Sequence, residues 1–428
     1  MITRIEAYHY RCFQKLDIAL ESQHVFAGSN GSGKTTLLDI PSLFSDLVSV
    51  SDINDAFFAP VNGRNFSRAV EASELIHKLQ GDNFYLVIEA KLPKEQQIIL
   101  QSKGPKRFRD KPENRSDSIR YELAFKIVDH LIEITEEHLM LFNHNNPNRP
   151  AHGQGIQGGR SLDSDTFPII ERNWRQKVSY RYEWQDKRET LRINFALEAK
   201  KTALGAMPAD AVNFPAAFWF LDFLKKGTHC YEPQWSVMRQ ASSPKFKDSF
   251  TADGSSLAWQ VLALQENDVE GLEQWIEIVR MALPNIANIK AKTREDDGYC
   301  YLLVTFQNKM QLSSSNLSHG TLHILALTLI SFINNPPQII TLEEPENGIH
   351  PKAIEAVLEG IKGAGQSQLF LSTHSPIVLA NTDLDKIITM SINSDGASVV
   401  LKGNEHPALK EWQGEIDLGS LFAAGVFE

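Results

Sequence analysis

The chain has 428 residues, of which 42% are hydrophobic and 22% charged, so its size and composition fit a folded protein of two or three compact units. A net charge of −10 opposes broad attraction to nucleic acid, and three cysteines are too few for a disulfide framework. No apolar run approaches the roughly 20 residues of a membrane span, and the N-terminus lacks an apolar signal core. We therefore expect a cytoplasmic protein without a membrane partner.

The first part of the chain predicts strands, a Gly-rich turn and a helix. Residues 2–10 alternate between apolar and polar side chains, 24–27 form a short apolar run, and 35–48 have helical spacing. Period-2 patterns between turn residues then predict antiparallel strands from residue 84 to residue 197. Asn, Gly and Pro dominate residues 143–161, which indicates a loop.

The remainder of the chain predicts an α/β core. Helical patterns occupy 216–226, 255–266 and 270–284. Beyond them, apolar strand patterns begin at residues 338, 368, 386 and 397, and a helix is predicted at 351–362 with Pro351 in its first turn. Strands separated by helices are typical of an α/β sheet.

GSNGSGKT, residues 28–35, fits the phosphate-loop pattern G-x-x-x-x-G-K-[ST] between a strand and a helix. Glycines at these positions let backbone N–H groups surround a phosphate, and the helix N-terminus adds its dipole. Lys34 supplies positive charge to the β- and γ-phosphates, and Thr35 supplies a hydroxyl ligand for Mg²⁺. The predicted nucleotide-binding residues here are Gly28, Ser29, Asn30, Gly31, Ser32, Gly33, Lys34, Thr35 and Thr36.

IITLEEPENGIHP, residues 339–351, places two carboxylates at the end of an apolar strand. In P-loop ATPases this end of the strand faces the metal, so we expect Glu343 to hold the water shell of Mg²⁺ and Glu344 to polarise the attacking water. Glu343 occupies a position commonly held by Asp. Its longer side chain favours contact with the metal through water.

STHSP, residues 372–376, follows the apolar strand QLFL. His374 lies one helix and one strand beyond Glu344, which predicts a place at the neighbouring strand end. A lone histidine is more often structural, but this position favours a sensor of the γ-phosphate.

LSHGT, residues 317–321, precedes the apolar helical pattern TLHILALTLISFI. Ser318 and Gly320 predict an anion site that combines a hydroxyl, open backbone N–H groups and a helix dipole. The alternative is an ordinary helix cap made by Ser318. One nucleotide does not need two such sites from a single chain, so we expect this turn to cap a nucleotide held by a second copy, in a head-to-tail homodimer.

These four motifs, in this order, resemble the ABC-type ATPases of the OLD-like (overcoming lysogenisation defect) group. The resemblance covers residues 1–92 and 211–392, and YRCF, residues 10–13, is similar to the first strand of that group, which makes Arg11 a candidate nucleotide contact. It implies ATP and Mg²⁺ as cofactors and heads that dimerise. It also implies service in bacterial anti-phage systems in which the ATPase controls a toxic nuclease.

The implied fold is α/β, a P-loop ABC-type ATPase head with a β-rich insertion and a helical sub-lobe. We expect an N-terminal lobe with the phosphate loop at 1–92, the insertion at 93–210 and the sub-lobe at 211–310. Residues 311–428 would form the C-terminal lobe. This lobe would contain the signature turn (317–321), the Walker B carboxylates (Glu343 and Glu344) and the switch histidine (His374).

The sequence departs from this group at two points. His319 replaces a small or acidic residue of the signature turn, and its bulk is expected to weaken the γ-phosphate cap. Many relatives also carry a C-terminal Toprim nuclease, and the segment after His374 is too short for one. We therefore expect this chain to be the ATPase alone, with a separately encoded effector.

A nuclease centre hidden inside the chain is the weaker interpretation. VIEAK (87–91) and LEAK (197–200) end in the E-x-K pattern of restriction-type nucleases, but alternating strands often produce that pattern. Two further pairs could be imagined as metal ligands, namely Asp163 with Asp165 and His144 with His152. We expect no nuclease centre here.

The function expected from the sequence is an ATP-hydrolysing molecular switch that controls an effector, which we expect to be a nuclease. An SMC- or RecF-like DNA-repair ATPase is the main alternative, although the sequence lacks long heptad arms. A transporter subunit would have a shorter gap between its motifs, and a scaffold that binds ATP without turnover stays open. DNA or RNA could contact the 93–210 insertion, whose basic run at 103–115 reads more simply as an exposed loop.

Overall fold

The computed structural model describes residues 1–60, 67–103, 116–145, 166–173, 175–183, 192–363, 367–409 and 416–426. They form two compact units. The first unit comprises Met1–Glu21, Gly31–Thr228 and Ser391–Val400, and the second comprises Ser22–Asn30, His229–Met390 and Leu401–Glu428. Across the described ranges, every helix is too short or too polar to cross a membrane.

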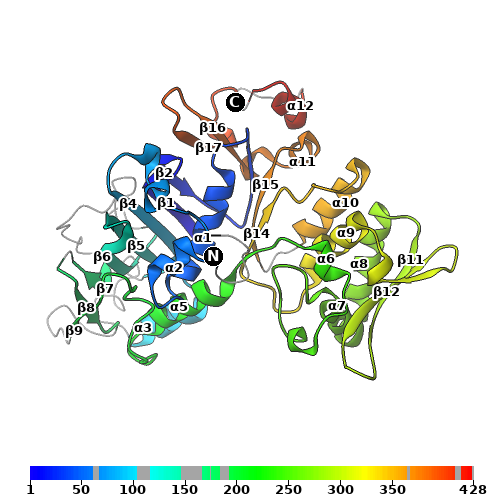
Figure 1. Cartoon of the computed structure of the whole chain (residues 1–428), viewed down its shortest axis with the longest axis horizontal. Helices are drawn as coiled ribbons and strands as arrows, with labels where there is room; N and C mark the ends of the chain where they lie inside the picture. The colour runs from blue at the N-terminus through cyan, green and yellow to red at the C-terminus, as the bar shows by residue number, and fades with distance from the viewer. Residues whose placement is uncertain are drawn as a thin grey trace. The chain divides into compact units, whose positions relative to one another are not determined.

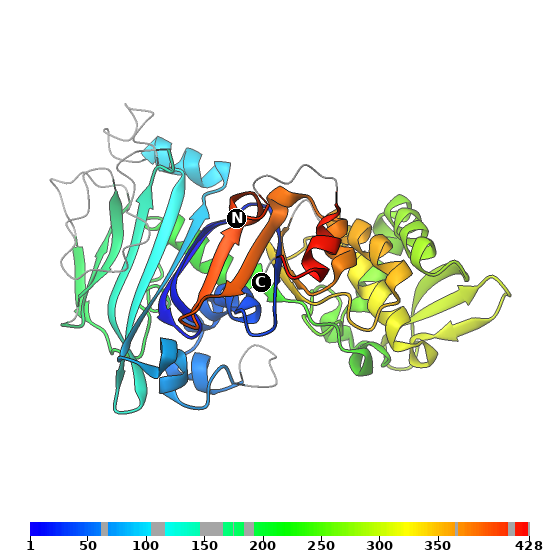
Figure 2. The same ribbon diagram turned by 90° about the horizontal axis from the view of Figure 1, so that it is seen from above.

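An antiparallel sheet of eight strands forms the centre of the first unit, in the order β2-β1-β4-β5-β6-β7-β8-β9. Figure 2 shows its long strands β5 and β6 side by side. The antiparallel strands predicted after residue 84 are thus confirmed. The bounds are β1 (Ile2–Tyr10), β2 (Phe13–Ala19), β4 (Asn83–Lys91), β5 (Ser118–Val128), β6 (Leu131–Phe142), β7 (Phe167–Arg172), β8 (Lys177–Arg181) and β9 (Arg192–Ala196).

The predicted boundary at residue 93 falls between two paired strands. β4 ends at Lys91 and pairs with β5 along its whole length, so the predicted N-terminal lobe and the predicted insertion share one sheet. The four-part division of the chain stays a prediction.

Helices pack on this sheet through aromatic side chains. Phe44 of α1 (Lys34–Leu47) and Phe220 of α5 (Pro215–Gly227) both contact Tyr121 of β5, at ring-centroid distances of 5.7 and 6.1 Å. Phe57 of α2 (Ile53–Phe58) meets the rings of Phe84 and Phe125 edge-on. Figure 1 shows α1, α2 and α5 on the sheet, and α3 (Lys94–Lys103) contacts α5. The aromatic layer holds α1, the helix that follows the phosphate loop, on a rigid support.

The second unit contains most of a six-stranded sheet in the order β10-β14-β15-β3-β16-β17. The strands β14, β15, β3 and β16 run parallel. The bounds are β3 (Gln23–Gly28), β10 (Thr228–Cys230), β14 (Ile339–Glu343), β15 (Gln368–Thr373), β16 (Ile387–Ile392) and β17 (Ser398–Lys402). The α/β core predicted from the sequence is present.

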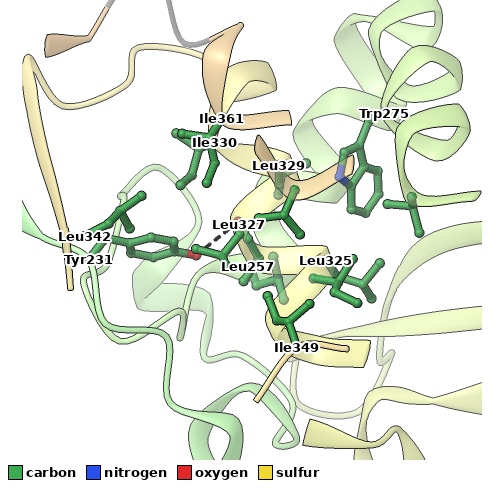
Figure 3. Close-up of a cluster of buried hydrophobic side chains, with 14 of the residues drawn as sticks. Tyr231, Leu257, Trp275, Leu325, Leu327, Leu329, Ile330, Leu342, Ile349 and Ile361 are labelled. Carbon is green, nitrogen blue, oxygen red and sulfur yellow. Dashed lines mark hydrogen bonds between the residues drawn. The ribbon is translucent and has the colours of Figure 1, made fainter. Parts of the chain in front are cut away.

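The helices of the second unit enclose a large apolar core, shown in Figure 3. Polar groups in this core have partners: Trp275 Nε1 donates to Thr328 Oγ1 (2.9 Å), and Tyr231 OH donates to the carbonyl of Ala326 (3.5 Å). The helices are α6 (Trp235–Met238), α7 (Leu257–Asn267), α8 (Val269–Ala282), α9 (His319–Leu329), α10 (Pro351–Lys362), α11 (Pro376–Ala380) and α12 (Leu418–Ala423). α10 has the bounds predicted from its sequence.

A small antiparallel sheet in the second unit was not expected from the sequence. It consists of β11 (Ile286–Thr293), β12 (Cys300–Phe306) and β13 (Gln311–Ser313). β11 and β12 lie within residues 211–310, which the sequence analysis assigned to a helical lobe.

Candidate nucleotide-binding site

The phosphate loop connects the end of β3 at Gly28 with the start of α1 at Lys34. Gly31 and Gly33 have φ values of 80° and 100°, in the left-handed region that glycine adopts at little cost. At Gly33 a side chain would also collide, since a Cβ there would lie 2.6 Å from Cys12 Sγ and 3.0 Å from Ser398 Oγ. Two constraints therefore require glycine at position 33.

Two features of this loop fit a bound phosphate. The side chain of Ser32 is fully buried, and its hydroxyl has no hydrogen-bond partner within the part of the chain that the structure describes. Gly33 is the N-cap of α1, so no side chain caps this helix. A buried hydroxyl and an uncapped helix N-terminus are both satisfied by an anion. The residues present therefore fit the triphosphate of a nucleotide.

Arg11 lies in the tight turn between β1 and β2, with φ of 52°. Its backbone N–H donates to the carbonyl of Leu75 (2.9 Å), and its Nη2 donates to the carbonyl of Arg68 (2.5 Å). The next residue, Cys12, is the one that packs on Gly33. The segment YRCF therefore supports the phosphate loop, while a direct contact of Arg11 with nucleotide stays a prediction.

Arg68 anchors α1 from the side. Its guanidinium, which is buried, pairs with Asp39 and Asp46 of that helix, with N–O distances of 2.7 Å to each. It also donates to the carbonyl of Ala56 (2.6 Å). These bonds fix the helix whose first residues are Lys34 and Thr35.

The carboxyl ends of three parallel strands meet at one edge of the six-stranded sheet. Glu343 of β14 is level with Ser372 of β15, which is level with Phe26 of β3. Glu344, His374 and Gly28 come directly after or close to these positions. The paired carboxylates, the switch histidine and the start of the phosphate loop therefore lie at the ends of three neighbouring strands. Ligands of open α/β sheets bind outside such strand ends.

Glu344 has an unusual conformation and two side-chain partners. Its φ is 42°, which is rare for a residue with a side chain, and its N–H donates to the carbonyl of Ser372 (3.0 Å). One carboxylate oxygen accepts from Asn347 Nδ2 (2.7 Å), and the other lies 3.3 Å from His374 Nε2. The side chains of Glu344 and His374 are 35% and 29% exposed, so solvent still reaches both. Strain of this kind is often retained at functional sites.

Glu346 and Asn347 of the same turn were not predicted as site residues. Glu346 Oε1 accepts hydrogen bonds from Thr373 Oγ1 (2.5 Å) and from the N–H of His374 (3.2 Å). The motif PENG contains both residues, but their roles depend on the register between β14 and β15. The sequence carried one signal for these residues: both are polar, and they follow Glu344, the expected base, by two and three positions.

The signature turn shows the helix cap that was the simpler interpretation. Ser318 is the N-cap of α9, and its hydroxyl accepts from the N–H of Thr321 (3.2 Å). Gly320 packs closely, since a Cβ there would lie 3.0 Å from the carbonyl oxygen of Gly348. The turn therefore touches the PENG turn after β14. The predicted role of Ser318 and Gly320 in capping a second copy's nucleotide stays a prediction.

The side chain of His319 packs against Gly348 and His323. A Cβ on Gly348 would lie 3.3 Å from Cε1 of His319, and its ring stacks on that of His323 with centroids 5.7 Å apart. Burial and the neighbouring His319 lower the pKa of His323 below its usual value, against a backbone hydrogen bond with Asn347. The exposed Trp235 lies 6.1 Å from the His319 ring.

The residues considered for a nuclease have other partners or fall outside the described ranges. Glu89 of VIEAK is fully buried and pairs with Arg120 at 2.6 Å. Glu198 of LEAK pairs with Lys201 at 3.1 Å, and the N–H of His144 donates to Asp117. His152, Asp163, Asp165 and most of the basic run at 103–115 lie outside the described residues. Within those residues, no three or more His, Cys, Asp or Glu side chains form a group that could hold a metal ion.

Residues 24–380 match the family described as "AAA domain, putative AbiEii toxin, Type IV TA system". None of the curated proteins matches the chain.

The fold is similar to those of solved SMC head domains. One is the SmcHead bound to the C-winged helix domain of ScpA, with a TM-score of 0.50, 14% identity and coverage of 94% of this chain and 96% of that chain. Two others are an Smc head with an extended coiled coil, bound to the C-terminal domain of ScpA, from Pyrococcus furiosus (0.46, 13%, 94% and 95%) and the SMC head from Thermotoga maritima (0.42, 12%, 94% and 98%).

At such identities the first likeness concerns the fold alone, and it confirms the predicted α/β fold of a P-loop ABC-type head. The family match spans most of the chain, from the phosphate-loop strand to the helix after His374. The protein therefore belongs to this family of AAA-domain P-loop ATPases.

Proposed function

We propose that this protein hydrolyses ATP as a dimerising switch that controls a separately encoded effector. The observation that carries the proposal is the meeting of β3, β14 and β15 at one sheet edge, which gathers the first residues of the phosphate loop with Glu343, Glu344 and His374. ATP hydrolysis needs a loop that binds phosphate, a carboxylate near the metal, a general base and a group that senses the γ-phosphate.

The roles follow from the position of each group. Residues 28–36 would bind the phosphates through their N–H groups, with Lys34 neutralising charge. Thr35 would hold Mg²⁺ directly and Glu343 would hold its water shell, and the ion would neutralise phosphate charge. Mg²⁺ usually needs only one or two protein ligands when phosphates and water complete its shell. Glu344 would orient and deprotonate the attacking water, and His374 would report whether the γ-phosphate is in place.

The α9 N-terminus supports a role for a second copy of the chain. Ser318 caps an 11-residue apolar helix whose dipole favours an anion at this end. We propose that this turn closes over the triphosphate bound by another copy, in a head-to-tail homodimer. The Ser318 hydroxyl accepts one hydrogen bond from Thr321 and can still donate one to a phosphate oxygen. Its role as helix cap is therefore compatible with the proposed contact.

The effector is proposed from resemblance. The motif order resembles the OLD-like group, and the description of the matched family names a toxin of a type IV toxin–antitoxin system. Both support an ATPase that controls a toxic activity, here in anti-phage defence with a nuclease as the effector. DNA or RNA would contact the 93–210 segment in this proposal.

A second candidate is an SMC-like ATPase that acts on DNA. The fold likeness to an SMC head over nearly the whole chain favours it. DNA-stimulated turnover by the purified chain, without an effector, would favour this candidate over the switch.

Three variants test the proposed function. With ATP and Mg²⁺, the wild type is expected to release phosphate, and Lys34→Ala is expected to lose binding of a fluorescent ATP analogue. Ser318→Arg should bind ATP as a monomer but fail to form the ATP-dependent dimer, measured by light scattering in the Glu344→Gln background. Ser102→Arg, at an exposed serine of α3, is the matched control. Normal dimerisation of Ser318→Arg would exclude capping by a second copy.

A further inference from the structure

We propose that Glu346 is a positioning residue that fixes His374 against Glu344, an inference that rests on the proposed ATP hydrolysis. Glu346 follows Glu344 by two residues, and its side chain crosses from the end of β14 to the end of β15. There its Oε1 accepts from Thr373 Oγ1 (2.5 Å) and from the backbone N–H of His374 (3.2 Å). One carboxylate oxygen thus binds two consecutive residues of the neighbouring strand end.

The hydrogen bonds continue into the next helix. Thr373 Oγ1, which donates to Glu346, also accepts from the N–H of Ser375 (2.9 Å). Ser375 is the N-cap of α11. The segment from 373 to 375 is therefore held at three consecutive positions, with Glu346 as the outer partner. The backbone from which the His374 ring projects cannot shift without breaking one of these bonds.

The position of the His374 ring matters because it meets Glu344. Its Nε2 lies 3.3 Å from Glu344 Oε1, while Asn347 holds the other oxygen of that carboxylate. Glu344 and Glu346 belong to the same short turn, so one turn supplies both the base and the carboxylate that places the histidine beside it. Positioning of this kind is worth a large share of catalysis, since a shift of about 1 Å can cost roughly 100-fold in rate.

The second oxygen of Glu346 is a further feature of this carboxylate. Oε2 is buried and has no hydrogen-bond donor within the described residues. A buried acceptor without a partner is unfavourable, so this arrangement is not the one that stability alone would select. This oxygen belongs to the carboxylate that holds the backbone of His374, which fits a residue kept for the site.

The first experiment compares variants that remove or keep the two hydrogen bonds. Glu346→Ala is expected to lower kcat for ATP roughly tenfold with KM changed less than twofold, while Glu346→Gln, which keeps an acceptor oxygen, falls only about threefold. Thr373→Val should lose several-fold more turnover than Thr373→Ser. Glu355→Ala, at an exposed glutamate of α10, is the control. Equal losses in kcat and ATP affinity, or no difference between Ala and Gln, would overturn the proposal.

A double-mutant cycle asks whether Glu346 acts through His374. In a His374→Ala background, Glu346→Ala should lower kcat by less than about twofold, because the group that it positions is already absent. A further tenfold loss in that background would mean that Glu346 acts by another route. A merely structural role would give additive losses together with a lower Tm.

A spectroscopic measurement does not depend on turnover. In protein with labelled histidines and no nucleotide, Glu346→Ala should shift or broaden the ring signals of His374, which the His374→Ala spectrum identifies, and Glu355→Ala should not. Unmoved His374 signals would overturn the positioning role. Absence of ATP hydrolysis by the wild type would instead overturn the proposed function, so the two failures are distinguishable.

Discussion

Carboxylates occur in two contrasting settings in this protein. In the eight-stranded sheet, Glu6 and Glu89 are fully buried, and each lies 2.6 Å from Arg120, which also pairs with Glu122 at 2.6 Å. Arg4 contributes a second, longer pairing to Glu89 at 3.9 Å. Burial works against ionisation of Glu6, but the Arg120 guanidinium more than offsets it and holds the pKa of that carboxyl below its usual value.

At the exit of β14, the described partners of Glu344 and Glu346 are of another kind. Glu344 accepts a hydrogen bond from the amide of Asn347, lies 3.3 Å from the imidazole of His374 and is 35% exposed, and Glu346 accepts from a hydroxyl and a backbone N–H. Glu344 also has a strained backbone. Arg120 neutralises buried carboxylates inside the sheet, whereas Glu344 stands at a strand end that solvent still reaches. We propose that only the second kind of carboxylate meets a substrate.

The largest expected effect concerns the β14 exit. Glu344→Gln should lower kcat for ATP by about 100- to 10,000-fold, the range for loss of a general base, while ATP binding is retained. The free energy of unfolding should stay within roughly 0.5 kcal/mol of the wild type, because the side chain is partly exposed. Phosphate release and urea unfolding measure the two quantities. A large loss of stability would place Glu344 with the structural carboxylates.

The matching change in the sheet is Arg120→Met. It removes the cation that three buried carboxylates share and should lower the free energy of unfolding by about 3–5 kcal/mol. Urea unfolding at pH 7 measures this. Arg280→Met is the control, since Arg280 pairs with Glu277 at the surface and should lose no more than about 1 kcal/mol. Equal losses of unfolding free energy in Arg120→Met and Arg280→Met would contradict a special structural role for the buried cluster.

Acid should weaken the sheet cluster. Because the pKa of Glu6 is lowered on folding, its ionised form stabilises the protein above its unfolded pKa of about 4.5, and this contribution is lost as the pH falls through the lower folded value. The stability of the wild type should therefore fall more steeply below about pH 4.5 than that of Glu6→Gln. Parallel curves for the two proteins in urea titrations from pH 5.5 to pH 3.5 would show that Glu6 is not linked to folding.

The smallest effect is expected at Lys91, the exposed end of VIEAK. Lys91→Ala should change the free energy of unfolding by no more than about 0.5 kcal/mol and leave ATP turnover as it was. Suppose instead that the purified wild-type chain cleaved nucleic acid and that Lys91→Ala abolished this activity. The E-x-K pattern of VIEAK, including Glu89, would then be catalytic.

Much of the fold could be predicted from local patterns. The strand at residues 2–10 and the helix at 351–362 have the predicted bounds, because alternation and a proline-led helix start are local signals. β11 and β12 were missed because they follow directly on a segment rich in helical patterns.

The phosphate loop and the three strand-end motifs could be found from the sequence because each is a contiguous pattern. The contacts of Glu346 could not, since they depend on which residue of β15 lies beside it. For the same reason, no local signal paired Arg120 with Glu6, which lies on β1, far away in the chain. Partners across strands follow from register, and single-sequence patterns do not fix register.

The contact between Gly320 and Gly348 has a consequence for how two nucleotides would be turned over. A Cβ at Gly320 would lie 3.0 Å from the Gly348 carbonyl, so the backbones of these turns touch with no flexible side chain between them. Any movement of the Glu344 turn during hydrolysis would pass directly to the surface proposed to close the opposite nucleotide. In the proposed homodimer, hydrolysis in one subunit would thus be coupled to the closure of the nucleotide site that it shares with its partner.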